Sequence, residues 1–132
     1  MQQNPQAYVE LELINQRLKE LDMQLQHIEM KLEQTVLAKN MITALQKANK
    51  GDELLIPIGA GVFITAQAGD ITQVKQAVGS GVVVEKSIEE SLALLEKQQK
   101  EVLGSQQQLS KAYEETVAKA MELQAQIEST QQ

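Results

Sequence analysis

The sequence predicts an α+β protein: a long antiparallel α-helical coiled-coil hairpin with two β-hairpins inserted between its helices. Two observations concern the helices. Apolar residues recur every three to four positions over residues 7–32, and a seam of the same spacing, apolar except at Gln99, Gln106 and Thr116, runs over residues 88–127. Such spacing, with Glu, Lys and Gln between, is typical of coiled coils. The third observation is that residues 51–86 hold six of the seven glycines and most of the β-branched runs, a pattern typical of hairpins.

The first helix is expected over residues 5–50, with Pro5 in its first turn. Two sets of residues form its apolar seam: Leu11, Leu18, Leu25 and Leu32, and Ala7, Ile14, Leu21 and Ile28. Continuing this heptad would bury Thr35 and Lys39. We therefore expect the seam to move to Val36 or Leu37 and then to Met41, Leu45 and Ala48, a stutter that locally unwinds a supercoil. Gly51 is the expected helix stop.

The second helix is expected over residues 87–130. Ser87 and Glu90 have the spacing of a capping box, in which the serine satisfies a free amide at the helix start. The seam of this helix contains Ile88, Leu92, Leu95, Gln99, Val102, Gln106, Leu109, Tyr113, Thr116, Ala120, Leu123 and Ile127. Gly104 lies inside the helix, where glycine costs about 1 kcal/mol relative to alanine.

The middle segment, residues 51–86, is expected to form four strands: Leu54–Ile58, Val62–Gln67, Ile71–Val78 and Val82–Glu85. Pro57 cannot donate to a strand ladder, so the first strand should be an edge strand or bulged there. Two hairpins without a covering helix leave apolar strands and unpaired edges, which predicts β-strands pairing between subunits. The residues expected to carry this oligomerisation are Leu54, Ile56, Ile58, Val62, Ile64, Val74, Val82 and Val84.

Composition and charge narrow the functional classes. The 132 residues make one ordinary domain, the formal net charge is −6 and no block of Lys or Arg occurs. Binding to nucleic acid or to an anionic membrane needs concentrated positive charge, so neither partner is expected. The chain has no cysteine, no signal-like start and no apolar run approaching the roughly 20 residues of a membrane span. These features predict a soluble cytoplasmic protein.

No residue pattern indicates an enzyme, a cofactor or a metal site. His27 is the only histidine and lies outside the seam, which favours a solvated side chain. The pairs Gly59–Gly61 and Gly79–Gly81 lack the remaining residues of phosphate-binding loops and lead into strands. Adjacent carboxylates such as Glu89 and Glu90 do not face each other on a helix. A two-helix rod is also expected to have no cleft.

The order of helix, two hairpins and helix resembles the α class of prefoldin subunits, of the archaeal type. The specific part of the resemblance is LLIPIGAGVFI, residues 54–64, and VGSGVVVEKS, residues 78–87. The family's smaller, beta class has one hairpin, so two hairpins favour the α class. The resemblance implies an ATP-independent chaperone in which two alpha subunits join four beta subunits. Hairpins would form a double β-barrel platform, and coiled-coil tips would hold non-native proteins and pass them to a group II chaperonin.

Several apolar residues outside the seams are candidates for binding non-native clients. Near the chain ends these are Tyr8, Val9, Leu13, Val117 and Met121. A second group, Met23 and Met30, shares a heptad position with Val9 and Leu37, about opposite the seam. Methionine suits a surface that must accept many shapes. Ordinary scatter of surface apolar residues is the alternative for both groups.

Two other classes of protein remain open. A structural coiled-coil scaffold or spacer without chaperone activity would need no apolar residues beyond the seam near the termini. A periplasmic adaptor of the efflux type also contains a helical hairpin, but it places its β elements outside the helices. Suppression of client aggregation without ATP would separate a chaperone from a scaffold.

Overall fold

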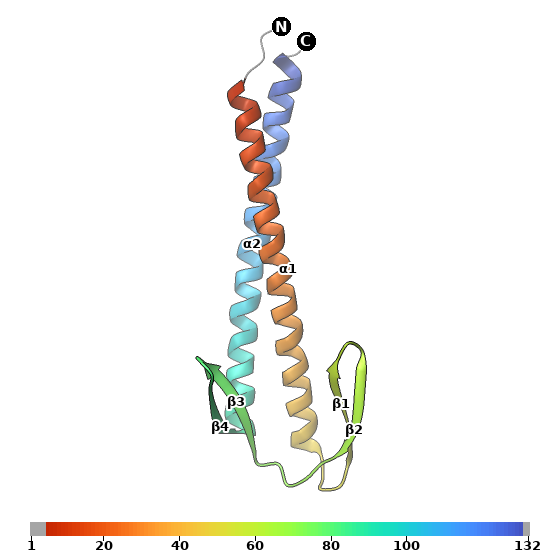
Figure 1. Cartoon of the computed structure of the whole chain (residues 1–132). Coiled ribbons are helices and arrows are strands. Elements are labelled where there is room, and N and C mark those ends of the chain that lie inside the picture. Colours follow the sequence, from red (N-terminus) through yellow and green to blue (C-terminus); the bar gives the residue numbers. More distant parts are fainter. Residues whose placement is uncertain (1–4, 131–132) are drawn as a thin grey trace. The chain divides into compact units, whose positions relative to one another are not determined.

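The computed structural model of the chain describes residues 5–130 as two long helices with two antiparallel β-hairpins between them (Figure 1). The elements are α1 (Pro5–Lys47), β1 (Glu53–Gly59), β2 (Val62–Gln67), β3 (Gln73–Gly79), β4 (Val82–Ser87) and α2 (Ile88–Thr130). The predicted fold class is thereby confirmed. Helix α1 ends at Lys47, before the expected residue 50, and β3 begins at Gln73, after the expected Ile71. Within residues 5–130, neither helix contains an apolar stretch of the length that a membrane span requires.

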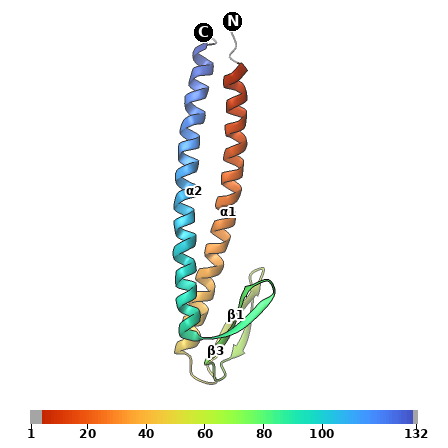
Figure 2. The ribbon, with the colours of Figure 1, turned by 90° about the vertical axis from the view of Figure 1, so that its left-hand side faces the viewer.

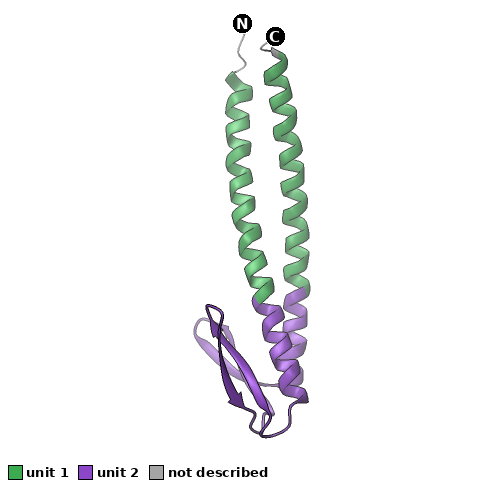
Figure 3. Cartoon of the chain, turned by 90° about the vertical axis from the view of Figure 1, so that its right-hand side faces the viewer, with its two compact units in different colours: residues 1–33, 100–132 green, residues 34–99 purple. Residues whose placement is uncertain are grey.

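The chain divides into two compact units (Figure 3). Unit 1 contains residues 1–33 and 100–132, and unit 2 contains residues 34–99. Within unit 1, residues 10–14 face residues 119–126, and residues 17–28 face residues 105–112, so α1 and α2 run antiparallel (Figure 2). The beginning of α1 and the end of α2 therefore lie at the same end of this unit.

The predicted seam forms the interior of unit 1. Ala7, Leu21, Val102 and Ile127 are buried, and Leu21 is completely inaccessible to solvent. The other predicted seam positions of this unit are half-buried. A two-helix seam buries only a narrow stripe, because each helix has a single neighbour within the chain. This explains why so few side chains are fully buried and why the sequence needs few aromatic residues.

The seam of α1 shifts later than predicted. Thr35 is buried at 8% exposure, whereas Leu37 is 49% exposed, so the original heptad continues past residue 32. Further along, Leu45 and Ala48 are half-buried as predicted, whereas Gln46 and Asn49 are exposed.

Lys39 is half-buried, and its ammonium group finds polar partners on α2. It donates to the Gln99 side chain over 3.3 Å and lies 3.7 Å from a carboxylate oxygen of Glu96. A polar residue is tolerated in a seam when its polar atoms are satisfied.

The two hairpins have the same register at an interval of 20 residues. Glu53 pairs with Gln67 and Gly59 with Val62, while Gln73 pairs with Ser87 and Gly79 with Val82. Each ladder shifts by one residue just before its turn, between Pro57 and Gly59 in one hairpin and between Ala77 and Gly79 in the other. Both two-residue turns have positive φ at both positions, with Ala60 at 54° and Ser80 at 52°. This is the geometry of a type I′ turn, which matches the twist of paired strands.

The second hairpin is held on the helices of unit 2 by polar and apolar contacts. Ser91 is 2% exposed and donates a 3.0 Å hydrogen bond to the side-chain oxygen of Gln76 in β3. Ile88 and Leu95, which lie close to Ser91 in the sequence of α2, are also buried. Ser87 accepts a 3.1 Å hydrogen bond from the backbone amide of Glu90, so the predicted N-cap is present.

Candidate interaction surfaces

Large apolar side chains are exposed along both hairpins. They are Leu55, Ile58, Val62, Phe63, Ile64, Val78, Val82 and Val83, with exposed fractions from 47% to 61%. Isolated exposed apolar residues are ordinary, but a concentration of them on a few short strands marks an interaction site. The free energy gained by burying this surface would therefore favour contact with another protein chain.

Four of the eight residues predicted for oligomerisation belong to this exposed set: Ile58, Val62, Ile64 and Val82. The other four, Leu54, Ile56, Val74 and Val84, are half-buried within the chain. Sequence reasoning missed Leu55, Phe63, Val78 and Val83, because it followed one face of each strand. The missed signal was the apolar character of consecutive residues, which is typical of strands buried on both faces.

Each sheet has only two strands, β1–β2 and β3–β4, so each of the four strands has one edge that does not pair within its own sheet. Backbone amide and carbonyl groups along such an edge are able to pair with a strand of another chain. Pro57 in β1 lies next to the ladder irregularity, as its missing amide predicted. The hairpins thus combine apolar side chains with available backbone groups.

In unit 1, most candidate client-binding residues near the helix ends are exposed. The exposed fractions are 40% for Tyr8, 57% for Val9, 58% for Leu13 and 68% for Met121. Val117 is half-buried and offers less surface than the sequence suggested. Leu13 also lines an open groove of about 500 Å³ between the two helices, together with Leu123. This end of the unit therefore presents an interrupted apolar surface.

The two methionines of the predicted stripe are among the most exposed apolar residues, at 70% for Met23 and 60% for Met30. Met23 also borders a groove of about 770 Å³ whose apolar lining includes Leu21, Ile28 and Leu109. This groove between the two helices is open to solvent and does not enclose a cavity. Small residues on α2 open the groove, because Ser105 and Ala112 leave space beside the larger side chains of α1.

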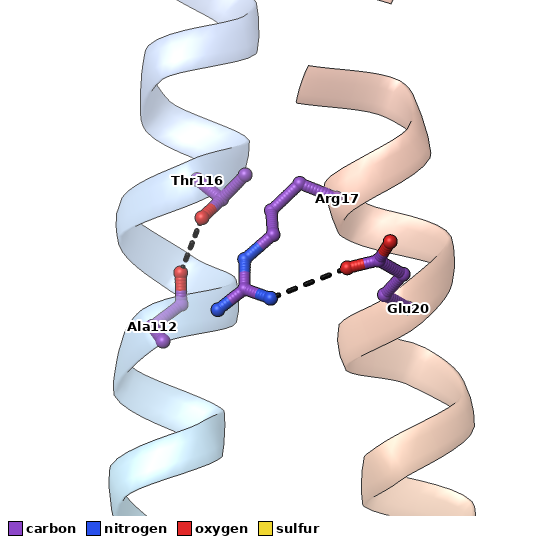
Figure 4. Close-up of polar contacts among 4 residues, drawn as sticks. All are labelled: Arg17, Glu20, Ala112 and Thr116. Atoms are coloured by element: carbon purple, nitrogen blue, oxygen red, sulfur yellow. Dashed lines mark hydrogen bonds and ion pairs between the residues drawn. The ribbon is translucent and has the colours of Figure 1, made fainter. Parts of the chain in front are cut away.

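The rim of this groove is polar. Arg17 extends from α1 toward α2 and pairs with Glu20 over 3.3 Å (Figure 4). Close by, the Thr116 hydroxyl donates a 2.6 Å hydrogen bond to the Ala112 carbonyl oxygen (Figure 4). His27 also lines the groove and is exposed. Within residues 5–130 no group of three or more His, Cys, Asp or Glu side chains that could hold a metal ion occurs. The groove has an apolar floor with hydrogen-bonding groups around it.

The arrangement of two helices around two hairpins is the fold of prefoldin subunits. A filamentous PFD from Methanocaldococcus jannaschii superposes with a TM-score of 0.67 and 20% identity, covering 87% of this chain and 95% of the other. The prefoldin beta subunit from Thermococcus strain KS-1 superposes with a TM-score of 0.62 and 17% identity, covering 98% and 95%. These identities show that the fold is shared.

The sequence comparisons establish the family. A family model described as Prefoldin subunit matches residues 12–132, and this chain belongs to the prefoldin family. The prefoldin subunit alpha of Thermofilum pendens is 30% identical over 104 residues, covering 75% of this chain and 81% of the relative. The matches span between 44% and 81% of the lengths of the curated alpha subunits compared. The predicted likeness to the α class is confirmed, and membership of the family supports a chaperone-type role.

Proposed function

We propose that this chain is the alpha subunit of a prefoldin that holds non-native polypeptides in the cytoplasm without ATP. The observation that carries the proposal is the concentration of exposed apolar residues on two hairpins with available edges. An isolated chain would leave this surface in water. Assembly with other subunits buries it and brings several pairs of helices into one particle.

The expected partners in the assembly are the smaller beta-class subunits. The prefoldin beta subunit from Thermococcus strain KS-1 shares the fold, and this supports strand pairing between the two classes. The family resemblance supports a stoichiometry of two alpha with four beta subunits. It also supports delivery of the bound client to a group II chaperonin.

Client capture is assigned to the end of unit 1 and to the methionine-bordered groove. The end carries Val9, Leu13 and Met121, and the groove is bordered by Met23. Unfolded polypeptides expose apolar side chains in no fixed pattern. A surface of separated apolar residues with flexible methionines accepts such ligands better than one shaped pocket would.

An aggregation assay with the assembled complex tests this function. Wild-type complex should suppress light scattering by a chemically denatured client in the absence of ATP. A complex whose alpha chain carries Val9→Gln, Leu13→Gln and Met121→Gln should suppress it less. Leu103→Gln is the matched control, because Leu103 is also an exposed apolar residue of α2, at 38%, but lies outside the set. Wild-type complex that leaves scattering unchanged would favour a scaffold without chaperone activity.

A further inference from the structure

The methionines of this chain are distributed unevenly between interior and surface. Four of the five lie within the described residues 5–130: Met23, Met30, Met41 and Met121. Met23, Met30 and Met121 are each exposed by 60% or more, whereas Met41 is half-buried. The three exposed methionines all belong to unit 1, and Met41 belongs to unit 2. We call the three exposed residues the methionine set.

The interior of unit 1 does not depend on methionine. Its buried side chains among the described residues are those of Ala7, Leu21, Val102 and Ile127. A chemical change at the methionine set therefore alters the surface of the unit and leaves its helix seam in place. The thioethers of the set are thus able to react with a reagent in solution without separation of the two helices.

The composition of the chain leaves methionine as its most readily oxidised residue. The chain has no cysteine and no tryptophan. A thioether reacts with peroxide to form a sulfoxide, a change that thiol-dependent reductases reverse. Access of the oxidant to the sulfur governs how fast one methionine reacts relative to another in the same protein. The exposed methionine set should therefore react before Met41.

The reaction is the transfer of an oxygen atom from hydrogen peroxide. A lone pair of the thioether sulfur attacks a peroxide oxygen, the O–O bond breaks, and an S–O bond forms. The sulfur is oxidised by loss of an electron pair, the peroxide is reduced, and the leaving oxygen departs as water after proton transfer. The product is a side chain of similar length that carries a polar oxygen on a formerly apolar sulfur.

A sulfoxide changes what the surface is able to bind. An apolar client side chain that contacts a thioether gains free energy by leaving water. The same contact with a sulfoxide would strip water from a polar oxygen, and an apolar client offers no donor to replace it, which costs free energy. The effect should be direct at Met23, because this residue borders the groove lined by Leu21, Ile28 and Leu109.

We propose that Met23, Met30 and Met121 form a peroxide-modification site whose oxidation to sulfoxides weakens the hold of the complex on non-native polypeptides. Met23 and Met30 are seven residues apart on α1 and therefore lie on one face of it, whereas Met121 lies in the last part of α2. The inference rests on the client-capture part of the proposed function. It adds a chemical input, because peroxide acts on the binding surface and leaves the hairpins and the seam of unit 1 unchanged.

Peroxide treatment of the assembled complex tests the proposal. After treatment, catalase removes the hydrogen peroxide, and fluorescence anisotropy measures binding of labelled, reduced and denatured lysozyme. Peptide mass mapping reports which methionines have gained oxygen. We expect the methionine set to be oxidised before Met41, and the affinity for the client to fall several-fold as the set is oxidised. Methionine sulfoxide reductase with a thiol reductant should restore both the thioethers and the affinity.

An alpha chain that combines Met23→Leu, Met30→Leu and Met121→Leu is the matched control. Leucine keeps an apolar side chain and a good helix former at each position, but it does not react with peroxide. The control complex contains the same beta subunits, so any loss of affinity caused by oxidation elsewhere would persist in it. It should bind the client as the wild-type complex does before treatment and should keep that affinity afterwards.

Three results would overturn the proposal: oxidation of the methionine set with unchanged affinity, oxidation of Met41 as fast as the set, or an equal loss of affinity in the leucine control. Each of these results leaves the proposed function standing, because the untreated complex still binds the client. An untreated wild-type complex that does not bind the client would instead overturn the proposed function and this inference with it.

Discussion

Ser91 of α2 and Gln76 of β3 form a 3.0 Å side-chain hydrogen bond that fastens the second hairpin to the helix. Ser91→Ala should destabilise the protein by about 1 kcal/mol, because the partly buried oxygen of Gln76 loses its donor. Chemical denaturation measures the change. Hydrogen exchange of β3 and β4 amides should become faster in the same variant. Unchanged exchange would mean that this bond does not hold the hairpin.

A substitution at Ala60 is expected to stabilise the turn between β1 and β2. This residue has φ of 54°, a left-handed conformation that costs ordinary side chains about 1 kcal/mol or more. Asparagine tolerates it and is favoured at the first position of type I′ turns. Ala60→Asn should therefore raise the melting temperature, and Ala60→Val should lower it. If both variants shift the melting temperature in the same direction, the turn geometry is not the cause.

Gly104 offers a stabilising change in the second helix. Apart from its chain neighbours and the backbone of its own helix turns, a Cβ added there would meet no atom within 4 Å, so alanine fits without a clash. Gly104→Ala should stabilise the protein by about 1 kcal/mol, the difference in helix propensity. Gly61→Ala is the matched control, since its Cβ would also have open space but its φ is 75°. That variant should be destabilised, and equal effects at the two sites would contradict this explanation.

The sequence predicted the helices, the strands and most of the seam because periodicity and glycine punctuation are local signals. It placed the seam shift too early, at Thr35, where rules of polarity argued against burial and the partners of Lys39 make a shift unnecessary. Those partners, Gln99 and Glu96, are about 60 residues away in the chain, and heptad spacing contains no information about them. The bond between Ser91 and Gln76 escaped prediction for the same reason.

The candidate surfaces were predicted less completely than the fold. Alternation identified one face of each strand and overlooked Phe63, whose ring is exposed on the other face. Val117 was placed outside the seam by its spacing, yet neighbouring helix residues half-bury it. A helix seam is wider than two heptad positions, because side chains beside it also touch the partner helix. Exposure at such positions depends on side-chain packing, which a repeat pattern does not specify.

The methionine pair gives a separate test of client capture. Met23→Gln combined with Met30→Gln keeps good helix formers and leaves the seam unchanged. Thermal stability and assembly should hardly change, because both side chains are mostly exposed. Affinity of the assembled complex for a large unfolded client should fall several-fold when measured by fluorescence anisotropy. Unchanged affinity would show that the two methionines are ordinary surface residues that do not bind the client.

The central claim is that the two hairpins bring this chain into an assembly. Native mass measurement of a chain in which residues 52–86 are replaced by a short flexible loop, mixed with beta-class subunits, tests it most directly. We expect the unaltered chain to join the beta subunits in one complex and the loop variant to remain a helical monomer. A loop variant that enters the complex as the unaltered chain does would show that the hairpins are not required for assembly.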